Sequence, residues 1–122
     1  MKKLTKAEEQ IMQVLWDIKK GFVKEIIEQL PDKPAYNTVS TIVRILEQKE
    51  FIGHESFGRS HQYFPLITKD EYSKSQLKSM VSDYFNGSFS KLVSFFAKEE
   101  DLNLNEMEDI MKELDELKNK KK

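Results

Sequence analysis

Five hydrogen-bonding side chains lie within eight residues of one amphipathic stretch: Asn37, Thr38, Ser40, Thr41 and Arg44. Asn can pair with adenine, Thr can contact a thymine methyl group or a phosphate, and Arg can bind guanine through two hydrogen bonds. The positive end of a helix dipole adds an attraction for phosphates. These side chains therefore predict a helix that enters the major groove of DNA. The alternative is a solvated helix face with capping residues, which the stretch taken alone favours.

A second polar cluster lies between two short segments in which apolar residues alternate. The segments cover residues 51–57 and 62–65, and Gly58-Arg59-Ser60 separates them as the tip of a β-hairpin. Arg59 projects from this tip, and Ser60 and His61 follow it. We expect the three to contact DNA phosphates or a narrow minor groove. The alternative is an ordinary surface hairpin.

The sequence contains no pattern of catalytic or metal-binding residues. It has no cysteine, which excludes disulfides, thiolate metal sites and cysteine nucleophiles. We expect Phe57 to pair with His61 and His54 to lie opposite Phe64, which keeps the two imidazoles apart. A phosphate-binding glycine loop and a metalloprotease motif are both missing. We therefore predict that the protein is not an enzyme and has no metal and no cofactor.

Three helices are expected to precede the hairpin. The first begins with the capping-box pair Thr5 and Glu8 and runs to about Lys19, with Gly21 as its C-cap. The second covers residues 23–30. The third begins at Asn37 or Thr38, either of which can cap it, and ends near Glu50, with four apolar residues on its buried face: Val39, Ile42, Val43 and Leu46. Three helices followed by a hairpin within about 65 residues are the order of a winged helix-turn-helix.

Three further helices are expected after the hairpin. The capping-box pair Thr68 and Glu71 begins a long helix, and Asn86-Gly87 ends it. A shorter helix follows, and Asn103 with Glu106 begins the last one. The predicted fold is mostly α with a small β-hairpin wing, divided into a winged-helix DNA-binding domain at 1–66 and a helical dimerisation domain at 67–122.

The three C-terminal helices carry more apolar side chains than so short a segment can bury. A second copy of the chain would cover them, most simply through a two-fold interface. The alternative is a compact monomer in which these helices pack onto the N-terminal domain. The residues expected at the dimer interface are Tyr84, Phe85, Phe89, Leu92, Val93, Phe96, Met107, Ile110, Met111 and Leu114.

Composition is consistent with these predictions but does not lead to them. The 122 residues are 39% hydrophobic and 34% charged, with a net charge of −1. The first 65 residues carry ten Lys and Arg against nine Asp and Glu, an excess too small to indicate DNA binding by itself. No signal peptide and no apolar stretch of membrane-spanning length is visible, so we expect a cytoplasmic protein without membrane insertion.

Several segments resemble the penicillinase repressors, the BlaI/MecI family. They cover nearly the whole chain: LTKAEEQIMQVLW at 4–16, YNTVSTIVRIL at 36–46 followed by Phe51-Ile52, HQYFPL at 61–66, GSFSKLV at 87–93 and KEEDL at 98–102. The resemblance implies a winged-helix head, a helical dimerisation region and repression through palindromic operator DNA. It also implies release when a membrane-embedded sensor metalloprotease responds to β-lactam and the repressor is cleaved in its C-terminal region.

The chain departs from the family pattern at three positions. The family cleavage bond joins Asn to Phe, and here it falls at Phe95–Phe96. Glu50 replaces a glycine that is common before Phe51. Ser40 stands where staphylococcal members carry a basic residue, which predicts a different operator. Because the chain has no cysteine, it also lacks the Cys pairs of the related copper-responsive repressors. The competing hypothesis is a winged-helix module that binds a partner protein and not DNA.

Overall fold

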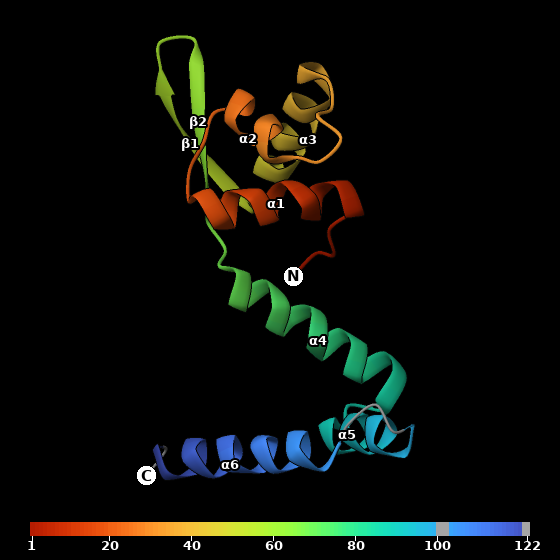
Figure 1. The fold of residues 1–122 in the computed structure, drawn as a ribbon. Coiled ribbons are helices and arrows are strands. Elements are labelled where there is room, and N and C mark those ends of the chain that lie inside the picture. Colours follow the sequence, from red (N-terminus) through yellow and green to blue (C-terminus); the bar gives the residue numbers. More distant parts are fainter. Residues whose placement is uncertain (100–102, 121–122) are drawn as a thin grey trace. The chain divides into compact units, whose positions relative to one another are not determined.

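The structure is a computed structural model that describes residues 1–99 and 103–120. Glu100, Asp101 and Leu102 of the KEEDL segment lie outside the described residues. The elements in chain order are α1 (Lys6–Ile18), α2 (Val23–Gln29), α3 (Tyr36–Gln48), β1 (Ile52–Phe57), β2 (Ser60–Pro65), α4 (Lys69–Phe85), α5 (Phe89–Lys98) and α6 (Leu104–Lys120) (Figure 1). This order confirms the predicted mostly helical fold with one small hairpin.

The chain forms two compact units, Met1–Gln76 and Leu77–Lys122, and each is described by itself. We call the first unit the head and the second the C-terminal unit. Within the described ranges, no helix combines the length and the apolar character that a membrane span requires.

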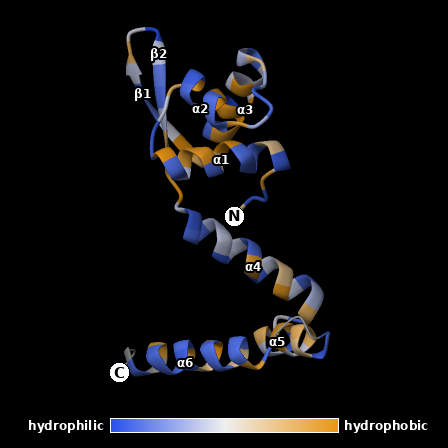
Figure 2. Cartoon of the chain, in the orientation of Figure 1, coloured by the Kyte–Doolittle hydropathy of each residue, from blue (hydrophilic) through white to orange (hydrophobic). Residues whose placement is uncertain are grey.

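The core of the head lies where α1, α2 and α3 meet the base of the hairpin. Figure 2 shows hydrophobic residues gathered where these helices face one another. Leu15, Ile26, Val39, Val43 and Leu46 are completely buried there. Their helical spacing follows the pattern that predicted the helices, because one apolar face per helix must be removed from water. Ile42 is only partly buried at the edge of this core, contrary to its predicted place on the buried face.

Helix α1 begins with the predicted capping box. The Thr5 hydroxyl accepts a hydrogen bond from the Glu8 N–H at 3.2 Å, and the Glu8 carboxylate accepts one from the Thr5 N–H at 2.8 Å. The predicted C-cap was wrong. Lys19 is the capping residue, with φ of 74°, and its N–H donates to the Leu15 carbonyl at 2.7 Å.

Gly21 has a different role from the predicted cap. It pairs with Tyr63 of β2 in an isolated bridge, in which each N–H donates to the other residue's carbonyl at 2.9 Å. A Cβ atom at Gly21 would lie 2.7 Å from Cδ1 of Ile18. A larger residue here would require the Ile18 side chain to move, so glycine lets this segment pair with the edge of the hairpin without displacing it.

Helix α3 begins earlier than predicted. Ala35 is its N-cap and offers no side-chain hydrogen bond, so neither Asn37 nor Thr38 caps the helix. The backbone N–H of Val39 already donates to the Ala35 carbonyl, which places both residues inside the first turn. Their side chains are exposed and have no capping role.

The hairpin has a shorter loop than predicted, and its register differs as a result. Only Gly58 and Arg59 connect the strands, and the φ of 64° at Gly58 suits the first position of a type II′ turn. Phe57 pairs with Ser60 and His54 with Tyr63, so the predicted Phe57–His61 pairing was wrong. A shift of one residue moves every side chain to the other face, and it places His61 on the same face as His54.

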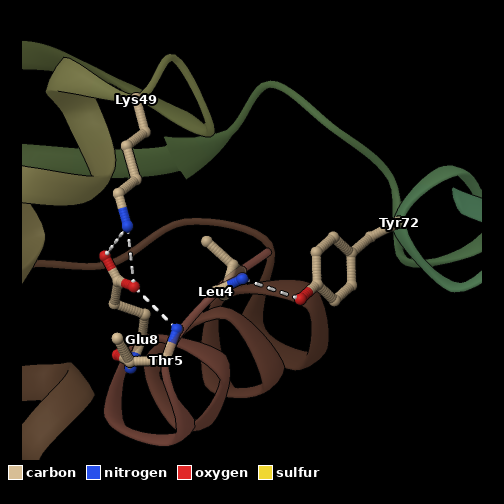
Figure 3. Close-up of polar contacts among 5 residues, drawn as sticks. All are labelled: Leu4, Thr5, Glu8, Lys49 and Tyr72. Atoms are coloured by element: carbon tan, nitrogen blue, oxygen red, sulfur yellow. Dashed lines mark hydrogen bonds and ion pairs between the residues drawn. The ribbon is translucent and has the colours of Figure 1, made fainter. Parts of the chain in front are cut away.

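The first turns of α4 belong to the head. The predicted Thr68–Glu71 capping box is present, with hydrogen bonds of 3.0 and 3.1 Å. The buried Tyr72 hydroxyl accepts from the Leu4 N–H at 3.1 Å (Figure 3). It also donates to the Glu9 carboxylate at 3.1 Å. The compact units therefore divide at Gln76–Leu77 inside α4. The functional division after residue 66 stays a prediction.

A buried ion pair joins α1 to the end of α3. Lys49 Nζ donates to both carboxylate oxygens of Glu8 at 2.9 Å (Figure 3). Burial alone would raise the pKa of Glu8. The Thr5 N–H, the Lys49 ammonium and the Thr5 hydroxyl outweigh that effect and hold the pKa below its ordinary value.

Glycine and asparagine separate the helices of the C-terminal unit as predicted. Asn86 and Gly87 both have positive φ, 51° and 76°, and they end α4. Ser88 caps α5 by accepting from the Lys91 N–H at 3.2 Å. Asn103 caps α6 by accepting from the Glu106 N–H at 2.8 Å.

Candidate nucleic-acid interface

A cleft of about 780 Å³ lies in the head between α3 and the hairpin. The N-terminal turn of α2 also lines it. The lining is largely polar and aromatic: Phe22, Val23, Lys24 and Glu25 from the start of α2, Tyr36, Asn37, Ser40, Arg44 and Glu47 from α3, and His54, Phe57, Arg59, Ser60, His61 and Tyr63 from the hairpin.

The cleft brings together six of the eight residues that the sequence predicted to bind DNA. Asn37, Ser40 and Arg44 line it from α3, because spacings of three and four residues place them on one face of the helix. Arg59, Ser60 and His61 line it from the hairpin. Helix α3 and the hairpin tip, about 15 residues apart in the sequence, thus contribute polar side chains to the same cleft.

The other two predicted residues lie outside the cleft lining. Thr38 borders a separate, smaller depression that Val39 and Ile42 also line. The Thr41 hydroxyl donates to the Asn37 carbonyl at 2.8 Å, so it already has a partner within the helix. That these threonines contact DNA stays a prediction.

Sequence reasoning missed the other nine lining residues, among them the polar side chains of Lys24, Tyr36, Glu47 and His54. Tyr36 and Glu47 could have been found, because they lie four residues before Ser40 and seven after it on the same helix face. Tyr36 is 53% exposed. Lys24 and His54 could not, because only the folded head brings α2 and β1 to this face.

The charge of the cleft favours an anion. Lys24, Arg44 and Arg59 supply three cations. Its two carboxylates already have partners: Glu25 accepts from the Phe22 N–H at 2.9 Å, and Glu47 is hydrogen-bonded to Nδ1 of His54. Burial, followed by the charge of Glu47, raises the pKa of the Tyr63 hydroxyl, while Arg44 opposes the rise. Tyr63 therefore remains a neutral side chain at physiological pH.

The described part of the chain, residues 1–99 and 103–120, contains no group of three or more His, Asp or Glu side chains that could hold a metal ion. Arg, Asn and Ser are the side chains that contact base edges and phosphates.

The geometry matches what DNA recognition needs. An α-helix fits the major groove, and a hairpin beside it reaches the adjacent backbone or minor groove. The strand of phosphates between the two grooves would then lie along the cleft, where the cations are. The fold and the cleft define the head as a winged-helix DNA-binding domain.

Comparison with known proteins agrees with this class. The solution structure of the DNA binding domain of the repressor BlaI is similar, with a TM-score of 0.50 and 28% sequence identity, over 59% of this chain and 94% of that one. The profile of the penicillinase repressor family matches residues 4–116. The chain therefore belongs to the penicillinase repressor family, whose members are transcriptional repressors and not enzymes.

Two relatives are similar to this chain over most of the length of both proteins. The methicillin resistance regulatory protein MecI of Staphylococcus aureus (strain N315) is 27% identical over 109 residues, which cover 88% of this chain and 89% of that protein. The penicillinase repressor of Bacillus licheniformis is 28% identical over 121 residues, which cover 98% and 94%. The similarity thus includes both the head and the C-terminal unit.

The C-terminal unit exposes the apolar side chains that the sequence predicted at a dimer interface. Among its described residues, Val81 is the only one that is buried. Phe89, Val93 and Phe96 lie on one face of α5 and are 49%, 39% and 41% exposed. Tyr84, Met111 and Leu114 are exposed as well, while Phe85, Leu92, Met107 and Ile110 are half-buried.

Phe95 and Phe96 lie in the C-terminal half of α5. The Phe95 ring packs edge-on against Phe85 of α4, with 5.7 Å between the ring centroids, and its own neighbour Phe96 is at 6.0 Å. The bond between them is therefore helical and flanked by two half-exposed aromatic rings.

Proposed function

We propose that this repressor acts as a homodimer on a palindromic operator. The observation that supports the proposal is the cleft, which Arg44 of α3 and Arg59 of the hairpin both line. Phosphate contacts from these cations and Lys24 would supply most of the affinity, so binding should weaken steeply with salt.

Sequence would be read by the face of α3 that lines the cleft. Arg44 can bind guanine through two hydrogen bonds, and Asn37 can pair with adenine. Ser40 can form a hydrogen bond with either of these bases. Thr38 and Thr41 would contact the other side of the groove or its phosphates. Ser60 and His61 would add contacts from the wing, beside Arg59.

The exposed faces of α5 and α6 support the dimer. Monomeric proteins rarely leave so much contiguous apolar surface in water, and a second copy would cover it through a self-complementary interface. Two heads would then read half-sites about one helical turn apart or slightly more. A repressor of this kind works where the chromosome is, so we place it in the cytoplasm.

Cleavage in α5 would release the operator. The family pattern points to the Phe95–Phe96 bond and to a membrane-embedded sensor metalloprotease as the protein that cuts it. The bond lies within a helix whose aromatic side chains contribute to the proposed dimer face. Cutting it would divide α5 and remove part of the proposed dimer interface. The two heads would then bind their half-sites independently and more weakly than as a dimer.

The test is the affinity of variants for DNA from upstream of the repressor's own gene. Arg44→Ala should lose about 1–3 kcal/mol of binding free energy and discriminate less against a substituted half-site. Lys112→Ala, which removes an exposed cation from α6, is the matched control and should bind as tightly as the unchanged protein. Equal losses in the two variants would show that Arg44 has no specific place in the interface. A complex with a protein partner that is insensitive to salt, without DNA affinity, would favour the protein-interaction module instead.

A further inference from the structure

Both histidines of the chain lie next to each other in the cleft. The ring centroids of His54 and His61 are 4.3 Å apart, because the register makes them diagonal neighbours on one face of the hairpin. Nδ1 of His54 is hydrogen-bonded to the carboxylate of Glu47 in α3. His61 stacks on Tyr63 at 6.2 Å, so the cluster connects the third helix to both strands of the wing.

Charged and titratable groups surround this pair from every neighbouring element. The His54 and Glu47 side chains are 31% and 33% exposed, which leaves both in contact with solvent. The other titratable and charged groups that line the cleft are Lys24 and Glu25 from α2, Tyr36, Arg44 and Glu47 from α3, and Arg59 and Tyr63 from the hairpin.

We propose that this head takes up a proton at the His54–His61 pair when DNA phosphates enter the cleft, so that operator affinity increases as the pH falls. The proposal rests on the proposed function. Imidazole gains its charge between pH 5 and 8, which no other unperturbed side chain does. The geometry brings the groups together: the two imidazole rings lie 4.3 Å apart, and Nδ1 of His54 is hydrogen-bonded to the Glu47 carboxylate.

DNA phosphates that enter the cleft would lie beside this pair. An anion within hydrogen-bonding distance favours the protonated form of an imidazole. DNA binding would therefore take up about half a proton on average between pH 8 and pH 6. Proton uptake on binding means that low pH strengthens the complex, by about tenfold between pH 8 and pH 6.

The composition makes the origin of such an effect unusually easy to assign. The chain has two histidines and no cysteine. Unperturbed Asp, Glu, Tyr, Lys and Arg side chains titrate outside the range from pH 6 to 8, and only the terminal amine remains. A His54→Gln/His61→Gln variant therefore has no side chain that ordinarily titrates in this range.

The experiment measures the affinity for upstream DNA and for shuffled DNA between pH 6 and 8 at constant ionic strength. The unchanged protein should bind the upstream DNA about tenfold more tightly at pH 6. The double His→Gln variant should change by less than about twofold, and His61→Gln alone should also lose most of the dependence. Arg59→Gln is the matched control: it should weaken binding at every pH and keep the tenfold ratio.

Three outcomes would overturn part of this account, and they can be told apart. Specific binding that does not change with pH would remove the proton linkage and leave the repressor function standing. A pH dependence that persists in the double variant would do the same, because it would come from another group. No preference for upstream DNA at any pH would contradict the proposed function itself. NMR titration of the imidazole protons with and without DNA would show directly whether His61 gains its charge in the complex.

Discussion

Replacing Lys49 with methionine should destabilise the head through a buried carboxylate. The Glu8 side chain is only 5% exposed and receives two contacts of 2.9 Å from Lys49 Nζ. Methionine keeps an apolar stem in place of the lysine stem, so packing changes little. The main effect is that Glu8 loses its cation and keeps its contacts with Thr5, among them the N–H at 2.8 Å.

The size of the loss can be estimated from these contacts. A hydrogen bond to a charged group contributes about 1.5–3 kcal/mol, and an uncompensated buried charge costs about 3–5 kcal/mol. Lys49 is itself 24% exposed, so water can reach the vacated space and solvate part of the charge. We therefore expect a loss of about 2 kcal/mol in the free energy of unfolding. For a unit of this size that lowers the Tm by about 8–16 °C.

Fluorescence of the single tryptophan provides the assay. Trp16 belongs to the head, and its Nε1 donates to the Ile67 carbonyl at 2.8 Å, so unfolding of the head changes its surroundings. Lys20→Met, at an exposed position after α1, is the matched control and should leave the Tm unchanged. Lys49→Met with Glu8→Gln should be more stable than Lys49→Met alone, because a neutral amide does not need the cation. A loss below about 0.5 kcal/mol for Lys49→Met would refute the reasoning, since the carboxylate would then be hydrated without lysine.

Three more predictions follow from particular residues. The lowered pKa of Glu8 means that its charge stabilises the head above the unfolded-state pKa of about 4.3, and that this stability is lost as the pH falls through the folded-state pKa. Glu8→Gln should therefore remove this part of the acid dependence of stability, measured by urea unfolding. A pH profile that is the same in the variant would contradict the prediction. Glu50 has a φ of 66°, a backbone conformation that favours glycine. Glu50→Gly should therefore stabilise the head by about 1 kcal/mol in thermal melts, whereas Glu50→Ala should not. Equal melting temperatures for the two variants would show that this position is not strained. Phe96→Glu should dissociate the dimer in analytical ultracentrifugation, while Lys98→Glu on the opposite side of α5 should not; a dimer that survives Phe96→Glu would have its interface elsewhere.

The local signals in the sequence predicted the local structure well. The capping boxes Thr5–Glu8 and Thr68–Glu71 form as expected, because each needs only side chains within one helical turn. The break at Asn86-Gly87 is of the same kind. The apolar period also identified the core of the third helix, apart from Ile42, because burial follows from which face a residue occupies.

Apart from the N-cap of α3, which is Ala35, the features that were missed depend on contacts between distant segments. Gly21 was predicted to cap α1, whereas its role is to let the backbone pair with Tyr63, forty-two positions later in the numbering. The hairpin register depended on whether the loop contains two residues or three, and Gly58 is compatible with both. A shift of the register by one residue decides whether His54 and His61 lie on the same face of the hairpin. Lys24 joined the candidate site only because folding brings α2 beside the wing.

The measurement that tests the central claim most directly is fluorescence anisotropy of the unchanged protein with DNA from upstream of its own gene, at two salt concentrations, with shuffled DNA as the control. The account predicts tight binding that prefers the upstream DNA, weakens steeply as salt is raised, and saturates at two chains per site. Absence of binding to either DNA at low salt would contradict it.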